Sequence, residues 1–290
     1  MSIGINTNVT SLIAQRKLSI NQSALQTNME RLASGYRINH ASDDAAGLTI
    51  SQNLISQVSR MQQADRNTQD GIGLLQTAEG SLSVIGDNLQ RIRELVVQAG
   101  NDTNNSNMRA AMTNEIQSLL SDNDRIALSS NINGVNLLDG SATNAVLQVG
   151  PNSNALTNTV DISSVLTDAS STGLNLVGTS GQTFASIATI DLSTSALANS
   201  FLKDVDNALQ AVNSQRANIG SFQNKLSSVD SNLNDAIVNF SASNSRIRDV
   251  DIASETASMT QNQILTQAST MVLSQTNDLP KMILSLLQKQ

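Results

Sequence analysis

Apolar residues recur at every seventh position in two long stretches, one in each half of the chain. A second apolar or small residue stands three positions behind most members of each repeat. Such an a/d pattern is typical of α-helices that wind around one another. It predicts long helices at about 45–99 and 197–250. The repeats are Leu75, Leu82, Leu89 and Val96, with Ala78, Ile85, Ile92 and Ala99, and then Val205, Val212, Ile219, Leu226, Leu233, Phe240 and Ile247.

Shorter amphipathic stretches occupy the two ends of the chain, at 1–35 and 253–290. Gly35 suits a helix C-terminus, where a left-handed residue is favoured. Pro280 would bend or interrupt the last helix. With one narrow apolar stripe each, these helices have little reason to be stable alone. The apolar positions seven apart are Leu18, Leu25 and Leu32, and then Leu265, Val272, Leu279 and Leu286.

The middle of the chain, 133–197, is rich in Ser, Thr, Asn and Gly and predicts short strands and loops. Asn133-Gly134 and Asp139-Gly140 are turn pairs. Strands are expected near Val146–Gln148, Val160–Ile162 and Leu174–Val177, a loop at 36–47 and a shorter helix at about 108–129. We predict a mainly α fold: a long antiparallel helical bundle or coiled coil with paired terminal helices and a small β-hairpin region at the turn-around.

Composition supports an elongated molecule with thin cores. Aromatic residues make up 2% of the 290 residues and hydrophobic residues 39%. The net charge of −7 disfavours a nucleic-acid partner, because phosphates would repel an acidic surface. The chain has no cysteine, and neither a signal peptide nor a membrane-spanning run is recognisable.

Residues that could carry catalysis or bind a metal are sparse. His40 is the sole histidine and stands in a polar loop, which favours a plain loop residue over a catalytic base. Asp122-Asn123-Asp124 lacks the glycine and the distal glutamate of a calcium loop. Asp249 and Asp251 are better interpreted as a helix-end charge cluster. We therefore expect no enzyme activity, no catalytic, cofactor-binding or metal-ligating residue, and no cofactor.

Several blocks of sequence closely resemble bacterial flagellin. The start Ile3-Gly4-Ile5-Asn6-Thr7-Asn8 and the run Arg31-Leu32-Ala33-Ser34-Gly35-Tyr36-Arg37 match that family. So do Asp43–Gly47, Gln90–Leu95, Ile132–Gly134, Ser245–Asp251, and Gln263–Leu265 through Leu279-Pro280 to Leu287. These blocks cover roughly 1–140 and 200–290, in order and at family-like spacing. The chain resembles a short flagellin.

The resemblance implies a two-layer organisation. The terminal coiled-coil layer, called D0, would combine 1–40 with 253–290. The rod layer, called D1, would comprise 41–252, with its β and loop region at about 133–197. No large outer domain is inserted. The implied function is a structural subunit that polymerises into the extracellular flagellar filament used for motility, after type III export. Subunit packing would involve Leu18, Leu25, Leu32, Leu265, Val272, Leu279 and Leu286.

The resemblance also implies partners. Besides further copies of the chain, these are filament cap and hook–filament junction proteins and a flagellar export chaperone. The positions matching the chaperone-binding segment are Ile264, Leu265, Val272, Leu279, Leu286 and Leu287. Host Toll-like receptor 5 recognises many flagellins, and the matching positions here are Arg91, Leu95 and Glu115. Neither nucleic acid nor a membrane is an expected partner.

Three alternative functions fit the sequence less well. A secreted translocator would need a membrane-active apolar segment, and an inserted metalloprotease would need two histidines. The nearest rival is a flagellin-like hook–filament junction protein, which shares the terminal helices but assembles in only a few copies. Polymerisation into long filaments would separate flagellin from that rival.

Overall fold

The fold is described from a computed structural model that covers residues 7–142, 145–171, 173–174 and 190–287, with the backbone alone for 279–287. These residues form six α-helices, one short 3-10 helix and two antiparallel two-stranded sheets. The predicted mainly α fold with a small β-hairpin region is confirmed. Two compact units are present: 1–58 with 239–290, and 59–238. The predicted layer boundaries at 40/41 and 252/253 remain a prediction.

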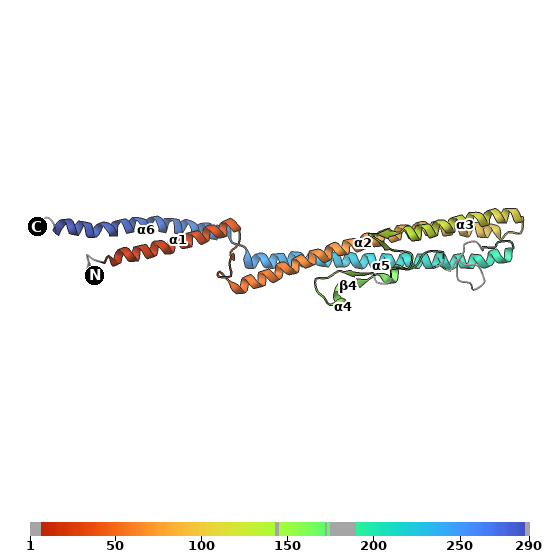
Figure 1. Cartoon of the computed structure of the whole chain (residues 1–290), viewed down its shortest axis with the longest axis horizontal. Helices are drawn as coiled ribbons and strands as arrows, with labels where there is room; N and C mark the ends of the chain where they lie inside the picture. The colour runs from red at the N-terminus through yellow and green to blue at the C-terminus, as the bar shows by residue number, and fades with distance from the viewer. Residues whose placement is uncertain (1–6, 143–144, 172, 175–189, 288–290) are drawn as a thin grey trace. The chain divides into compact units, whose positions relative to one another are not determined.

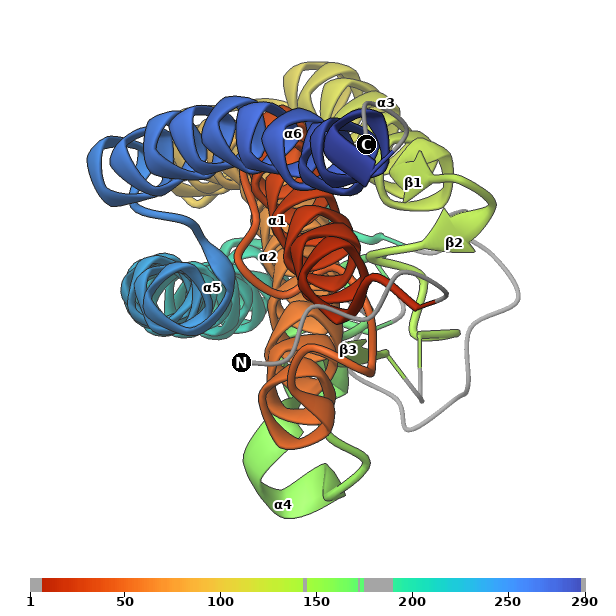
Figure 2. The same ribbon diagram turned by 90° about the vertical axis from the view of Figure 1, so that its left-hand side faces the viewer.

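The first unit brings the two ends of the chain together. It contains α1 (Val9–Ser34) and α6 (Ile252–Leu287), with the start of α2 (Ala45–Ala99) and the end of α5 (Ser195–Arg248). α1 and α6 lie side by side (Figures 1 and 2). Ser11 bonds to Asn277, whereas Asn28 meets Asn262, so the two helices are antiparallel.

Local signals in the sequence fix the helix ends in this unit. Asn8 caps α1 by accepting a hydrogen bond from the Ser11 N–H at 3.1 Å. Gly35 ends α1 with a φ of 74°, as predicted from its position. Asp44 accepts a bond from the Gly47 N–H at 2.8 Å and so caps the start of α2. Polar caps and one glycine therefore place both boundaries.

Helix α6 continues through Pro280 to Leu287, so the predicted interruption is wrong. A proline inside a helix removes one N–H donor and crowds one carbonyl four residues earlier. The helical bonds on both sides of that gap carry the helix across it.

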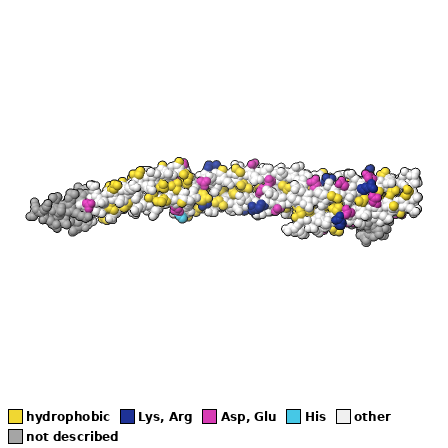
Figure 3. Space-filling model, turned by 90° about the horizontal axis from the view of Figure 1, so that it is seen from above, with side chains coloured by type: hydrophobic (Ala, Val, Ile, Leu, Met, Phe, Trp, Pro, Cys, Tyr) yellow, Lys and Arg dark blue, Asp and Glu magenta, His cyan; other side chains and the backbone are white. Residues whose placement is uncertain are grey.

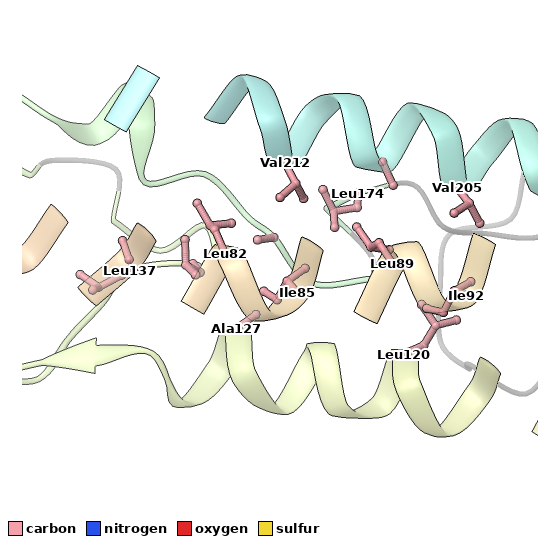
Figure 4. Close-up of a cluster of buried hydrophobic side chains, with 14 of the residues drawn as sticks. Leu82, Ile85, Leu89, Ile92, Leu120, Ala127, Leu137, Leu174, Val205 and Val212 are labelled. Atoms are coloured by element: carbon pink, nitrogen blue, oxygen red, sulfur yellow. The ribbon is translucent and has the colours of Figure 1, made fainter. Parts of the chain in front are cut away.

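The second unit is built on the long repeats. α2 and α5 run antiparallel, and α3 (Ser106–Ser129) runs back along α2 (Figure 1). The eight repeat positions of α2 from Leu75 to Ala99 are at most 1% exposed. Figure 4 shows Leu82, Ile85, Leu89 and Ile92 of α2 lying between Val205 and Val212 of α5 and Leu120 and Ala127 of α3. The heptad pattern therefore marks the core.

The β region contains two hairpins. β1 (Asn131–Ile132) pairs with β2 (Val135–Asn136), and β3 (Val146–Gln148) pairs with β4 (Thr159–Asp161). The short α4 (Ala155–Asn158) precedes β4, and η1 (Ser163–Val165) follows it. Asn133 and Gly134 form the first turn with φ values of 52° and 81°. Positive φ at both positions is what a type I′ hairpin turn requires.

The strands predicted near Val146–Gln148 and Val160–Ile162 are confirmed as β3 and β4, whereas a strand at Leu174 is wrong. Ile162 lies just after β4, and Leu174 lies in a turn. Their side chains are 0% and 7% exposed, so their apolar character reflects anchoring in the core rather than strand pairing. Residues 175–177, the rest of the predicted third strand, lie outside the described residues.

The sequence suggested that the β region lies at the turn-around between α2 and α5, and this is wrong. Leu147 of β3 contacts Gly71 of α2, and the Gln148 carbonyl accepts a bond from Asn67 at 3.0 Å. At the turn-around, Arg109 at the start of α3 donates to the Ser193 carbonyl at 3.0 Å. The reason is that α3 returns along α2 before the strands begin, which brings them back beside the middle of that helix.

Candidate functional site

The exposed apolar surface of the α1–α6 pair is the strongest candidate site. On α1, Val9, Leu12, Ile13 and Ile20 are 50–59% exposed. On α6, the exposed set is Ile252, Ile264, Leu265, Met271 and Val272, at 41–73%. Figure 3 shows hydrophobic side chains on the surface beside the grey terminal residues. Large apolar residues gathered on two adjoining helices are typical of a surface that another protein covers.

On α6 the exposed apolar residues line a shallow hollow. Its walls come from a single face of the helix, at Ile252, Ala253, Ala257, Ile264 and Leu265. Small alanines between larger side chains leave room into which a partner's side chains can fit. The chemistry of this surface is apolar packing, because it carries no charged side chain.

The predicted packing residues fall into two groups. Leu18, Leu25 and Leu32 are half-buried on α1, whereas Leu265 and Val272 are exposed on α6. The side chains of Leu279, Leu286 and Leu287 lie outside the described part of the structure. The leucine stripe of α1 and the apolar stripe of α6 therefore differ in how far they are covered within one molecule.

Sequence reasoning missed the most exposed apolar residues of α1. Leu12, Ile13 and Ile20 lie off the row of Leu18 and Leu25, so a search that follows the leucine row passes over them, although Ile13 and Ile20 are themselves seven apart. The adjacent pair Leu12-Ile13 was the available signal. In an amphipathic helix with one apolar stripe, two neighbouring large apolar residues cannot both lie at its centre.

Two chain segments cross beside each other at the base of this unit. The Arg37 N–H donates to the Arg248 carbonyl at 2.6 Å, and the Val250 N–H donates to the Gly35 carbonyl at 3.0 Å. The Arg248 guanidinium also stacks over the Tyr36 ring, 4.1 Å from its centroid. Backbone bonds and one cation–π contact thus tie the segment after α1 to the segment before α6.

The loop between α1 and α2 is organised by a carboxylate. Asp43 accepts hydrogen bonds from the N–H groups of His40 and Asn39 at 3.0 and 3.1 Å. These two bonds lower the pKa of the Asp43 carboxyl. His40 itself is exposed and places Nε2 2.7 Å from Glu30 Oε1. The sole histidine therefore contacts a surface carboxylate.

A second candidate cluster lies where α2 meets α3. Arg91 donates to Glu115 from Nε and Nη2 at 3.2 and 3.0 Å, and to Glu94 from Nη1 at 3.1 Å. Glu115 is the main cause of the raised pKa of Arg91, followed by Glu94. The structure brings Arg91 and Glu115 together on the surface but buries Leu95, which is 3% exposed. Leu95 belongs to the hydrophobic core instead of the surface cluster.

The described residues contain neither a candidate metal-binding cluster nor a candidate membrane-spanning helix. In the ranges that the structure covers, no group of three or more His, Asp or Glu side chains is arranged to hold a metal ion. None of the described helices combines the length and the apolar character needed to cross a bilayer.

Comparison with known families matches both ends of the chain. A model of the bacterial flagellin N-terminal helical region matches residues 5–143, and one of the bacterial flagellin C-terminal helical region matches 202–287. The flagellins of Halalkalibacterium halodurans and Bacillus subtilis are each 40% identical, over 284 and 307 residues. In both cases the match covers 98% of this chain and 99% of the relative.

A spirochaete protein and two solved structures are also similar. The flagellar filament 30.7 kDa core protein of Treponema maltophilum is 38% identical over 98% of this chain and 99% of its own length. The crystal structure of Bacillus cereus flagellin has 31% identity and a TM-score of 0.47, over 58% of this chain and 88% of that one. A putative flagellar hook-associated protein from Vibrio parahaemolyticus has 17% identity and a TM-score of 0.57, covering 71% and 100%, and shares the fold alone.

Proposed function

This chain belongs to the bacterial flagellin family and is a structural subunit of the flagellar filament, and we propose that its copies pack through the apolar faces of α1 and α6. The observation that carries this proposal is the set of exposed residues led by Ile264, Leu265 and Val272. Burying a side chain of this size stabilises an assembly by about 1.5–3 kcal/mol. A few such contacts per copy, repeated along a polymer, favour association.

The proposed arrangement is an open polymer. A contact between unlike surfaces of two copies, if it does not close into a ring, continues indefinitely as a helix. Terminal helices with narrow apolar stripes gain stability when neighbouring copies cover them. We propose that 1–40 with 253–290 form the terminal layer and that 41–252 form the rod layer. The grouping of 1–58 with 239–290 in one compact unit supports this division.

A triple substitution tests the packing surface. Leu265→Ser, Met271→Ser and Val272→Ser together remove three large apolar side chains from the exposed face of α6. The variant is expected to stay folded in its second unit and to lose polymerisation after salt-induced assembly. Electron microscopy and sedimentation measure the filaments, and circular dichroism measures the fold.

The matched control is Leu156→Ser on α4, where the side chain is 94% exposed in the other unit. It removes a still more exposed apolar residue outside the proposed surface and should leave filaments intact. Normal filaments from the triple variant would refute packing through α6.

We further propose that the apolar face of α6 serves a second partner before assembly. A flagellar export chaperone would cover Ile264, Leu265, Val272, Leu279, Leu286 and Leu287 and so keep free chains apart. Exposure of Ile264, Leu265 and Val272 supports this role. The same proposal places the assembled chain outside the cell after type III export, bounded by filament cap and hook–filament junction proteins. It assigns the chain no catalytic step.

Recognition by Toll-like receptor 5 is proposed at the Arg91–Glu115 cluster. Both side chains are about half exposed and present opposite charges on adjacent helices. Arg91→Ala combined with Glu115→Ala is expected to weaken receptor binding, measured with the purified receptor ectodomain. Arg93→Ala, which breaks the exposed ion pair with Asp206, is the control. Unchanged binding by the double variant would remove this proposal.

A further inference from the structure

Met271 stands in a row of exposed apolar residues on α6. Their steps along the sequence are those of one helix face, and we call the five residues the α6 stripe: Ile264, Leu265, Ala268, Met271 and Val272. Met271 is the most exposed of its large members, at 73%. None of these five side chains carries a hydrogen-bond donor. A polar group placed in the stripe would therefore have only apolar side chains of the same face beside it.

The thioether of methionine is the group in this chain that a peroxide oxidises most readily. The chain has 8 methionines, no cysteine and no tryptophan. In the reaction, the methionine sulfur attacks hydrogen peroxide, the O–O bond breaks, one oxygen stays on sulfur and the other leaves as water. Sulfur loses the two electrons that the peroxide gains. The product is a sulfoxide, which is polar where the thioether was apolar.

Burial divides the methionines into accessible and protected groups. Met61 and Met112 are 3% and 8% exposed, whereas Met271, Met108 and Met29 are 73%, 52% and 46% exposed. An oxidant must reach the sulfur atom before it can react. Of these five side chains, we therefore expect Met271 to be oxidised fastest in the free chain.

A sulfoxide at Met271 would lose its hydrogen-bond donors when another copy covers the stripe. Its oxygen accepts hydrogen bonds from water as long as the chain is free. Two hydroxyls of the same stretch, on Thr266 and Thr270, already donate to carbonyls of their own helix at 2.7 and 2.8 Å. Burying a polar group without a partner is unfavourable. Oxidation should therefore weaken packing between copies, while the exposed position leaves α6 itself folded.

We propose that Met271 is a modification site at which hydrogen peroxide controls assembly. Oxidation of its thioether in the free chain prevents the α6 stripe from packing, and reduction of the sulfoxide restores packing. In the assembled polymer, neighbouring copies cover Met271 and protect it from the same oxidant. The inference rests on the proposed packing through α6 and adds to it a chemical step that regulates this surface.

The first test compares oxidised with untreated chains. Full-length protein is treated with hydrogen peroxide, the excess is destroyed with catalase, and polymerisation is induced by salt. The lowest concentration at which native chains form filaments should rise by about tenfold, in step with the sulfoxide that peptide mass spectrometry finds at Met271. Each variant is compared with its own untreated sample. Met271→Leu removes the sulfur, so peroxide should leave its assembly concentration unchanged.

Two further variants serve as controls. Met108→Leu removes an exposed methionine of the second unit and should remain as sensitive to peroxide as the native chain. Met271→Gln places a permanently polar side chain of similar length in the stripe. It should need a higher concentration for assembly without any oxidant, and circular dichroism should show unchanged helix content.

Reduction tests whether the sulfoxide causes the loss. Oxidised chains are incubated with two methionine sulfoxide reductases, one for each epimer, and dithiothreitol. The sulfoxide oxygen leaves as water while the dithiol becomes a disulfide. The chain itself has no cysteine that could exchange with the reductant. Assembly should return to the level of untreated chains.

Preformed filaments show whether neighbouring copies cover the stripe. With free N-acetylmethionine in the same tube as a reference, Met271 should be oxidised about tenfold more slowly in filaments than in free chains. Rapid oxidation of Met271 in filaments would count against the proposed packing through α6. The inference alone is overturned if native chains assemble normally with Met271 oxidised, or if the reductases fail to restore assembly. It is also overturned if Met271→Leu stays sensitive or if Met108→Leu protects equally well.

Discussion

The side chain of Leu147 on β3 lies directly over Gly71 of α2, in the space where a β-carbon would stand. A second contact, the bond from Asn67 Nδ2 to the Gln148 carbonyl, holds the strand at the same place. Because Gly71 has no side chain, the hairpin can pack closely against α2 at this position.

Gly71→Ala should stabilise the protein less than Gly73→Ala does. Alanine favours a helix by about 1 kcal/mol over glycine, and at Gly73 no atom lies within 4 Å of the place that the new methyl group would take. At Gly71 the methyl group must displace Leu147, and overpacking costs about 1–3 kcal/mol. Chemical denaturation measures both variants. Adding Leu147→Ala to Gly71→Ala should recover the difference in unfolding free energy between the two glycine variants. Equal stabilities of the two single variants would contradict close packing of Leu147 on Gly71.

Asp65→Asn should raise the melting temperature at neutral pH. The neighbouring carboxyl of Asp230 is the main cause of the raised pKa of Asp65, followed by burial, while Arg66 and Asn234 act in the opposite sense. Because the folded pKa lies above the unfolded one, the folded state binds this proton more tightly. The stability that this proton contributes is fully present below the unfolded pKa and is lost as pH rises through the folded pKa.

Thermal melts between pH 3 and pH 8, a range of about five units around carboxyl titration, test this sign. The Asp65→Asn chain should show a smaller decline in stability with rising pH than the native chain. Asp70→Asn, an exposed change on the same helix, is the control. An unchanged pH profile for Asp65→Asn would show that the neighbouring carboxyl does not raise the pKa of Asp65.

Leu89→Ala should destabilise the second unit by about 2–5 kcal/mol, because it opens a cavity between α2 and α5. Leu89 is 0% exposed in the centre of the core (Figure 4). Val84→Ala removes apolar volume from the same helix at a side chain that is 46% exposed. Its effect should stay within about 0.5 kcal/mol. Urea unfolding followed by circular dichroism distinguishes the two.

Gln215→Met should cost about 1–3 kcal/mol, since it leaves two carbonyl groups, one of them in a buried residue, without their donor. Gln215 occupies a seam position of α5 and is 7% exposed. Its Nε2 donates to the carbonyls of Val165 and Thr167 at 3.3 and 3.1 Å. Gln210→Met makes the same exchange on the exposed side of α5. Stabilities that match between the two variants would argue against a structural role for the Gln215 amide.

The sequence predicted the second unit well because its pattern and its packing coincide. The leucines from Leu75 to Leu89 are apolar, evenly spaced and buried. In the first unit, the end of α1 at Gly35 was also predicted, because it depends on the conformation of that one residue. Structural features that depend on a few neighbouring residues can be predicted from the sequence alone.

The α1–α6 pair was harder because the apolar heptad is not the contacting face of α6. Leu265 and Val272 stand exposed, whereas Asn262 and Ser269 turn toward α1. Periodicity identifies an apolar stripe but says nothing about which partner covers it. The position of the β region was missed for a related reason: Leu147 and Gly71 are far apart in the sequence, and their fit depends on how α3 routes the chain.

The crossing of the two segments at Gly35–Arg37 and Arg248–Val250 has a mechanical consequence. The chain enters and leaves the terminal helix pair through strands that are hydrogen-bonded to each other in antiparallel fashion. The hydrogen bonds between the two segments therefore transmit force from one to the other, so neither segment extends without loading its neighbour. A rotating fibre loads its subunits continually, and this junction gives each subunit two coupled tethers in place of one.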